Sequence, residues 1–249
     1  MEKKNLETFI EKYSLGGTLE SVLWTNDNDD IVVTAMTSTK TLFASVRWEK
    51  AAFFKGVKIG LDDTSKFKKL LTPLSDDITL SLDMDENNPT RVRQVFADDG
   101  KITSMFVASG EDVIDRVPIM KNIPQFTVEI IIPPEFVDVY NKSFSGIDDK
   151  DALFTLIMSK KKQKMEMVLG WKQKNLSDRI ALPVTTTVGK DTVKNPISFN
   201  ARHLKEILSA NSEVNNAVLS VSEAGLAGIS FSHEQFKSQY YLVKINTED

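Results

Sequence analysis

The sequence predicts an α+β protein built mainly from short antiparallel strands, with four short helices in two similar halves. Three observations carry this prediction. Alternating or β-branched runs occur about a dozen times and are separated by turn residues. Four other segments place apolar residues at helical spacing. The order of helix, strands, helix, strands then occurs twice along the chain, which indicates an internal duplication.

The predicted strands are bounded by residues that favour turns. Asp98-Asp-Gly100 is typical of a hairpin turn, whereas residues 26–30 and 148–151 are acidic segments that predict polar loops. The strands are expected at residues 31–35, 41–48, 78–82, 91–96, 102–108, 126–132, 152–158, 164–171, 179–187, 217–222, 227–231 and 240–245.

Each of the four helices is expected to bury one apolar stripe. Asp63 and Asn200 precede the second and fourth stripes by four residues, where an N-cap is expected, and Pro133-Pro134 suits the start of the third helix. The stripes are Leu6, Phe9, Ile10 and Tyr13; Phe67, Leu70, Leu71 and Leu74; Phe136, Val139 and Tyr140; and Leu204, Ile207 and Leu208.

The spacing of the stripes supports the duplication. The first two begin 61 residues apart and the last two 68 residues apart. Residues 63–71 and 200–208 both run from a capping residue into an apolar residue, a lysine, a second charge and two aliphatic residues. We therefore predict a first domain over residues 1–115, an extended apolar connector over 116–125, and a second domain over 126–249.

Composition excludes several classes of function. The chain has 249 residues, a net charge of −4, no cysteine and two histidines, His203 and His233. Disulfides, thiolate metal sites and cysteine nucleophiles are therefore absent, and no phosphate loop or G-x-S-x-G motif occurs. The paired aspartates stand at turns and helix starts, and both histidines are expected at the surface. We expect no enzyme, no cofactor and no bound metal.

The sequence also bears on location. No run of about 20 apolar residues occurs, so no membrane helix is expected, and the amino-terminal residues lack the apolar stretch of a signal peptide. We expect a cytoplasmic protein, in the host cytoplasm if a phage encodes it, although a nuclear location remains open.

Basic residues cluster on or beside the predicted helices, away from the apolar stripes. They could contact phosphates, or they could simply solvate the outer faces of amphipathic helices. The run Lys160-Lys-Lys-Gln-Lys164 could be a hairpin tip, a protected sheet edge or a phosphate contact. The helix-associated set is Lys3, Lys4, Lys12, Lys66, Lys68, Lys69, Lys142, Arg202 and Lys205.

Three segments resemble the DNA sliding clamps, both the proliferating cell nuclear antigen (PCNA) type and the related phage processivity factors. Lys237-Ser-Gln-Tyr-Tyr-Leu-Val-Lys-Ile-Asn-Thr-Glu-Asp249 is similar to the closing strand and acidic tail of that family. Ala35-Met-Thr-Ser-Thr-Lys-Thr-Leu42 is similar to a segment that follows an early strand, and residues 197–208 match the entry to a helix of the second domain. The order of helices and strands agrees along the whole chain.

The resemblance implies a clamp fold, with two similar domains whose helices line a ring around duplex DNA. It implies three copies closing head to tail, no chemistry, and partners that include a DNA polymerase and a clamp loader. The basic set above would face DNA, and edge strands over residues 103–110 and 172–180 would close the ring. A partner peptide would occupy a groove formed by Met36, Leu42, Ile119, Met120, Ile123, Tyr241 and Val243.

Two alternatives remain at this point. One is a monomeric accessory protein of the same fold that holds DNA only by charge, which predicts steep salt dependence. The other is an unrelated β-rich binding protein. Met36, Leu42 and Tyr241 could equally be ordinary core residues.

Overall fold

A computed structural model describes residues 1–51, 53–54, 56–118, 120, 122–147, 152–159, 164–171, 178–191, 193–215 and 217–246. The chain divides into two compact units. The first comprises Met1–Met36, Ala44–Pro118 and Ser232–Ser238, and the second Thr37–Phe43, Ile119–Phe231 and Gln239–Asp249. Each unit therefore includes a short piece of the other half of the sequence.

All four predicted helices are present. The predicted caps of α2 and α4 are confirmed, because the Asp63 side chain accepts a hydrogen bond from Lys66 N (2.7 Å) and Asn200 accepts one from His203 N (3.0 Å). The helices are α1 (Lys3–Ser14), α2 (Thr64–Leu71), α3 (Pro134–Ile147) and α4 (Ala201–Ser209).

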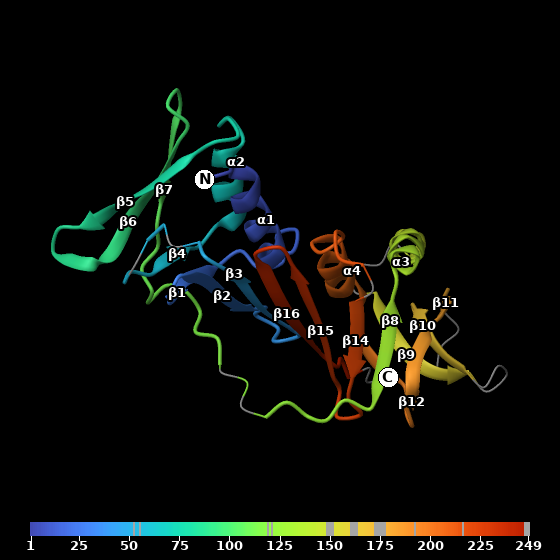
Figure 1. Cartoon of the computed structure of the whole chain (residues 1–249). Coiled ribbons are helices and arrows are strands. Elements are labelled where there is room, and N and C mark those ends of the chain that lie inside the picture. Colours follow the sequence, from blue (N-terminus) through green and yellow to red (C-terminus); the bar gives the residue numbers. More distant parts are fainter. Residues whose placement is uncertain are drawn as a thin grey trace. The chain divides into compact units, whose positions relative to one another are not determined.

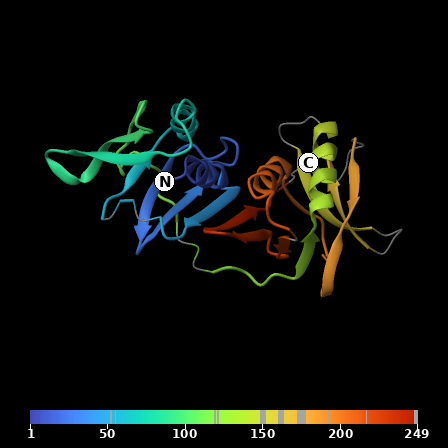
Figure 2. The same ribbon diagram turned by 45° about the horizontal axis from the view of Figure 1, so that its top comes forward.

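In the first unit, β3-β2-β1-β4 are consecutive in one sheet, and three strands form another sheet in the order β5-β6-β7. Helices α1 and α2 pack together, with α1 against β2 and α2 against β7 (Figures 1 and 2). The strands are β1 (Val22–Asp27), β2 (Asp30–Met36), β3 (Leu42–Trp48), β4 (Ile59–Leu61), β5 (Thr79–Asp85), β6 (Asn88–Asp98) and β7 (Thr103–Val107).

Aromatic side chains fill the core of the first unit. Trp24 contacts Phe9 of α1 (ring centroids 5.6 Å apart) and Phe67 of α2 (5.8 Å). Phe67 also meets Phe106 of β7 at 5.3 Å, so α2 joins the two sheets. Trp48 meets Phe236, which the last strand supplies, at 5.7 Å. The first three of these ring pairs are edge-to-face and the last is tilted, and such contacts add to the stabilisation from burial.

In the second unit, β12-β8-β14-β15-β16 are consecutive in one sheet and β11-β10-β9-β13 form another. Helix α3 packs on α4 and on β10 and β11, while α4 packs on β9 (Figure 2). The strands are β8 (Val128–Ile132), β9 (Leu153–Ser159), β10 (Lys164–Leu169), β11 (Ile180–Pro183), β12 (Thr185–Asp191), β13 (Ile197–Asn200), β14 (Ala217–Val221), β15 (Leu226–His233) and β16 (Phe236–Val243).

The two units share a pairing that the sequence does not reveal. In the second unit, β8 precedes α3 and pairs with β14, which follows α4. In the first, Glu2 precedes α1 and bridges Asp77, which follows α2; Ile78 N also donates to Met1 O (3.0 Å). Each unit therefore closes with its opening residues beside the strand after its second helix, as expected for a duplication.

The structure corrects several predicted elements. Strands β1, β4 and β13 are absent from the twelve expected by pattern. The single strand expected over 179–187 is two strands that break at Val184. Residues 26–30 form a tight β1–β2 turn, with Asp27 opposite Asp30, and not a loop. Val139 is 48% exposed, so the stripe of α3 buries Tyr140 but not Val139. The predicted loop 148–151 lies outside the described residues.

The segment around residue 118 has no regular structure. Residues 115–118, 120 and 122–127 belong to no helix or strand (Figure 1), and the connector over 116–125 stays a prediction. Among the described residues, no helix is long and apolar enough to cross a membrane.

Candidate DNA-binding and partner-binding surfaces

Five of the predicted DNA-facing cations project freely from the helices. Their side chains are exposed, and none has a hydrogen bond or ion pair to another described residue. They are Lys4 on α1, Lys66 and Lys69 on α2, Lys142 on α3 and Arg202 on α4. Each helix pair therefore presents positive charge that a phosphate could meet without breaking an existing interaction.

Two other predicted cations already have partners within the first unit. Lys3 Nζ donates to the carbonyl of Leu74 (2.5 Å), which ties the start of α1 to the segment after α2. Lys68 Nζ lies 2.6 Å from Glu11 Oε1 and links α2 to α1. Both remain part of the helix surface, but a phosphate would have to compete with these contacts.

Lys12 does not face DNA, so that prediction is wrong. Its side chain is only 1% exposed, and its ammonium lies 5.9 Å from the ring centroid of Phe236. Its position beside the apolar stripe of α1 places the stem inside the core, where the aromatic ring faces the cation. Lys205 lies between the buried and the exposed cations. Its side chain is half-buried, and its ammonium lies 5.3 Å from the ring centroid of Phe144.

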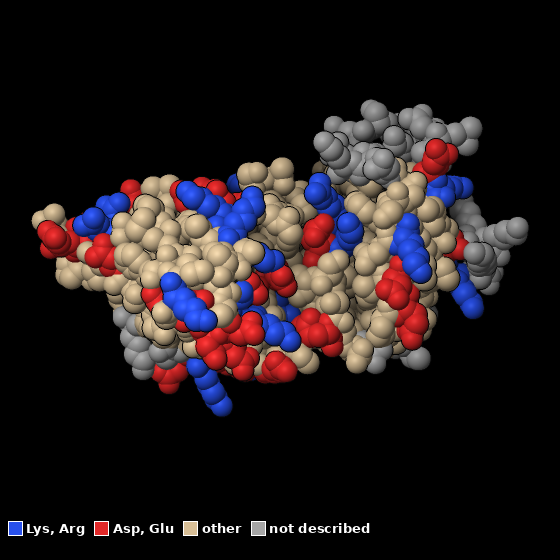
Figure 3. All heavy atoms as spheres, turned by 90° about the horizontal axis from the view of Figure 1, so that it is seen from above, with Lys and Arg blue, Asp and Glu red and all other residues tan. Residues whose placement is uncertain are grey.

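In neither unit do the helices present basic side chains alone. Figure 3, seen from above, shows Lys and Arg side chains interspersed with Asp and Glu. Glu7 and Glu11 lie on α1, Glu135 and Asp138 on α3, and Glu206 on α4. The local field is therefore weak, which suits low-affinity contacts to the DNA backbone and not tight electrostatic binding.

The predicted peptide groove is only partly at the surface. Ile123 is 47% and Val243 39% exposed, and Met36 and Met120 are half-buried. Leu42 is 0% and Tyr241 4% exposed, so both belong to the core and are not open groove residues. Ile119 lies outside the described residues.

Phe43 is the groove candidate that the sequence reasoning missed. It is half-buried on the opposite face of β3 from Leu42, and its ring lies 6.1 Å from that of Tyr241. The alternation of residues 42–48 could have identified Phe43, because successive side chains of a strand face opposite sides and a buried Leu42 therefore implies an outward Phe43. Val243 N donates to Thr41 O (3.0 Å), which places the end of β16 next to this strand.

Two of the strands at sheet edges, β7 and β11, overlap or adjoin the edges predicted to pair with another chain. Strand β7 is the edge of its sheet, and Met105 and Val107 are 47% and 62% exposed. The predicted edge was longer, but Ala108 N donates to Arg93 O (2.8 Å) and Ser109 N to Gly60 O (2.9 Å), so these residues already have partners. Strand β11 is the edge of the other sheet. Residues 172–177 of the second predicted edge lie outside the described residues.

The two histidines belong to different units and have different surroundings. His203 is half-buried, not solvated as expected: its Nε2 lies 3.1 Å from Thr41 Oγ1, and its Nδ1 is buried without a partner among the described residues. Burial, and then the charge of Arg202, lower the pKa of His203 to about 4. His233 is the last residue of β15, and its Nε2 lies 3.8 Å from Glu234 Oε1. No metal-binding group of three acidic or histidine side chains occurs in the described part of the chain.

The basic run at 160–164 stays a prediction. Residues 160–163 lie outside the described residues, and Lys164 is an exposed first residue of β10.

Two units of antiparallel sheet, each with two helices, define the fold class of the DNA sliding clamps. This chain has that fold. It superposes on PCNA from Entamoeba histolytica with a TM-score of 0.70, at 18% identity over 98% of this chain and 96% of that one. It superposes on a chain of the PCNA2–PCNA3 complex from Sulfolobus tokodaii with a TM-score of 0.66, at 12% identity over 98% and 97%. No family model and no curated protein matches the sequence.

Proposed function

We propose that the protein is a sliding clamp, which encircles duplex DNA as a ring of three copies and tethers a DNA polymerase. The main support is the combination of a full-length clamp fold with exposed, unpaired cations on all four helices. A threaded ring needs only weak phosphate contacts, because its topology and not its affinity keeps it on DNA. A net charge of −4 is compatible with that role.

In this proposal the protein carries out no chemistry. Its free edges β7 and β11 belong to different sheets, so pairing the one with the other in a neighbouring copy makes a head-to-tail contact that can close into a ring. A separate loader would have to open that ring. Polymerase segments would dock near Ile123 and Val243, the most exposed apolar residues of the predicted groove.

Retention on closed DNA tests the proposal. Dilute protein is mixed with nicked circular plasmid, concentrated so that copies assemble, and passed through a gel-filtration column at high salt. A ring stays with the circle and is lost when one cut linearises the plasmid. Blocking both ends of the linear DNA with streptavidin should restore retention.

The monomeric alternative makes the opposite prediction. A clamp-fold protein that holds DNA by charge alone would leave circular and linear DNA equally, and faster as salt rises. Equal loss from both forms would therefore contradict the ring.

A further inference from the structure

The first unit contains a polar pocket of about 340 Å³ that the proposed clamp function does not use. It lies between the residue before β4, the first part of β6 and the segment 109–116. None of the residues that line it belongs to the predicted peptide groove or to the DNA-facing set.

The walls of the pocket are held by the backbone. Lys58 forms an isolated bridge with Arg91, and Gly60 forms another with Ser109. Gly60 is needed for this crossing, because a Cβ there would lie 2.3 Å from the carbonyl oxygen of Ser109. The segment after β7 stays beside β6 as far as Ala108, whose N–H donates to Arg93 O. The preceding residues of β6, up to Val92, line the pocket instead.

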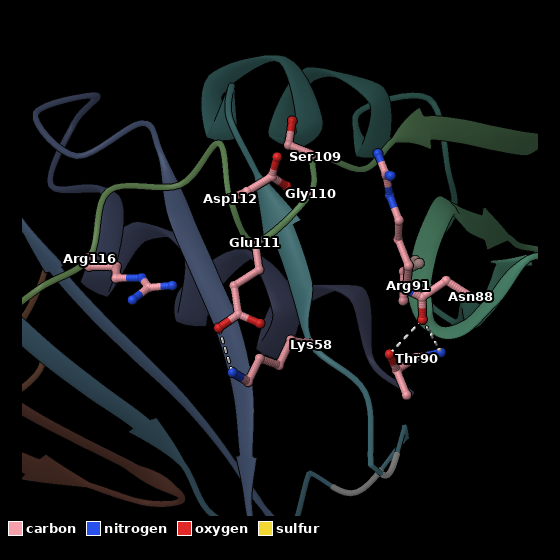
Figure 4. A pocket seen from close by; sticks show the side chains of 10 residues that line it. Lys58, Asn88, Thr90, Arg91, Ser109, Gly110, Glu111, Asp112 and Arg116 are labelled. Carbon is pink, nitrogen blue, oxygen red and sulfur yellow. Dashed lines mark hydrogen bonds and ion pairs between the residues drawn. The ribbon is translucent and has the colours of Figure 1, made fainter.

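Three cations from separate segments meet at this pocket, and two of them are unpaired. Lys58 Nζ lies 2.6 Å from Glu111 Oε1. The side chains of Arg91 and Arg116 are exposed, and neither makes an ion pair or a hydrogen bond to any other described residue. Figure 4 shows Arg91 on one side and Arg116 on the other, with the Lys58–Glu111 pair between them.

A side chain at position 110 would narrow the pocket. A Cβ on Gly110 would lie 2.3 Å from Asp112 Oδ1 and 3.6 Å from Arg91 Nη2. Glycine therefore leaves room for the Asp112 carboxylate beside the Arg91 guanidinium. A guanidinium binds carboxylate or phosphate oxygens with two parallel hydrogen bonds.

The other lining groups distinguish between those two anions. The repulsion from Glu111 and Asp112 grows with the charge of the ligand, so it opposes a polyanion such as a DNA backbone more strongly than a peptide with one or two carboxylates. Asn88 Oδ1 accepts from Thr90 N (3.2 Å) and Oγ1 (2.8 Å), which leaves the side-chain NH₂ to donate to an acceptor such as a peptide carbonyl. The volume is at the small end of the roughly 300–1,000 Å³ range of ligand pockets. It suits a short peptide and not a folded domain.

We propose that this pocket binds an acidic peptide segment of a partner protein, with Arg91 and Arg116 each binding one of its carboxylates. Glu111 competes with these carboxylates for Lys58. The site is a second docking point, separate from the apolar groove, and it needs neither DNA nor a ring.

Peptide titration of the full chain tests this site directly. The probes are a blocked hexapeptide with two central glutamates and the same peptide with glutamines, followed by fluorescence anisotropy. The glutamate peptide should bind at least about tenfold more tightly, because a hydrogen bond to a charged group contributes about 1.5–3 kcal/mol and 1.4 kcal/mol is tenfold. Arg91→Gln and Arg116→Gln should each weaken it about tenfold.

A matched control separates the pocket from general charge. Arg93→Gln removes the same charge two residues along β6, outside the pocket, and should leave binding unchanged. Glu111→Gln should strengthen binding a few-fold because it releases Lys58, which mere loss of structure would not do.

Three results would overturn the proposal. They are equal binding of both peptides, unchanged binding in Arg91→Gln and Arg116→Gln, and displacement of the peptide by inorganic phosphate or a short duplex at equal concentration. Because the assay contains no polymerase or plasmid, its outcome is independent of the ring experiment.

Discussion

Lysines of the four helices look alike in the sequence, but burial divides them into different roles. Lys4 is exposed and unpaired, Lys68 pairs with Glu11, and Lys12 is buried over Phe236. Local spacing cannot separate them, because the residue that covers Lys12 lies more than 200 positions away in the sequence. The N-caps Asp63 and Asn200 were predictable because a cap depends only on its own helix.

The buried lysine leads to a stability prediction. Lys12→Glu places a carboxylate against the negative face of an aromatic ring and should lower the free energy of unfolding by about 3 kcal/mol or more. Lys4→Glu makes the same charge change at an exposed position of α1 and should cost less than about 0.5 kcal/mol. Urea denaturation of both variants measures the difference. Equal losses would mean that Lys12 is not buried in solution.

His203 leads to a pH prediction. Its folded pKa of about 4 lies below the unfolded value of 6.5, so the unfolded state binds the proton more tightly between these values. Stability from this group is present above pH 6.5 and is lost as pH falls towards 4. Allowing for its partial exposure, the native chain should lose about 1 kcal/mol more between pH 7 and pH 5 than His203→Gln. Parallel urea curves at the two pH values test this, and identical pH dependence would contradict it.

At the scale of the element, the helices were more predictable than the strands. A stripe such as Leu6, Phe9, Ile10 and Tyr13 is a local signal. Strand β4 has only three residues and pairs with β1, which is distant in sequence, so nothing local marks it. The groove residues were hard to predict for the same reason, because local sequence does not show which face of β3 meets the core. The prediction therefore chose Leu42 and not Phe43.

The exposed helix cations should act together on DNA. Reversing Lys66, Lys69 and Arg202 to glutamate should weaken binding to short duplex and reduce its salt slope by about 3, at about 0.9 per lost phosphate contact. The matched control reverses Lys40, Lys50 and Lys101, which are exposed and lie outside the helices. Anisotropy over a salt series measures both variants. If the two triple variants lose affinity equally, the helices have no special role.

The exposed apolar residues of the groove give a separate prediction. Ile123→Ala and Phe43→Ala should each weaken binding of an apolar polymerase-derived peptide by about 1–2 kcal/mol, since each removes apolar area from the contact. Val139→Ala truncates a residue of similar exposure on α3 and serves as the control. Calorimetry measures the affinities, and unchanged values for Ile123→Ala and Phe43→Ala would rule out this groove.

For the whole molecule, the layout was predictable and the pairing was not. The repeated order of helix and strands follows from patterns that each half carries by itself. The exchange of Thr37–Phe43 and Ser232–Ser238 between the units depends on contacts between residues far apart in sequence.

The proposed assembly can be measured by sedimentation equilibrium. The native chain should approach three times its 27.9 kDa mass as concentration rises. Val107→Asp, at a 62% exposed position of edge strand β7, should shift the equilibrium towards the monomer without changing the thermal midpoint by more than a few degrees. A native chain that stays monomeric at high concentration would exclude the ring, although not the fold.

Phe236 belongs to the first unit but is among the last residues to be synthesised, which affects folding during translation. The first unit cannot complete the packing around Trp48 and Lys12 until the last hairpin has left the ribosome. At about 5–20 residues per second, this delay is on the order of 10 s after residue 118 has been added. During that time the nascent chain carries an unfinished aromatic core, so the growing protein should depend on chaperones more than its simple two-part plan suggests.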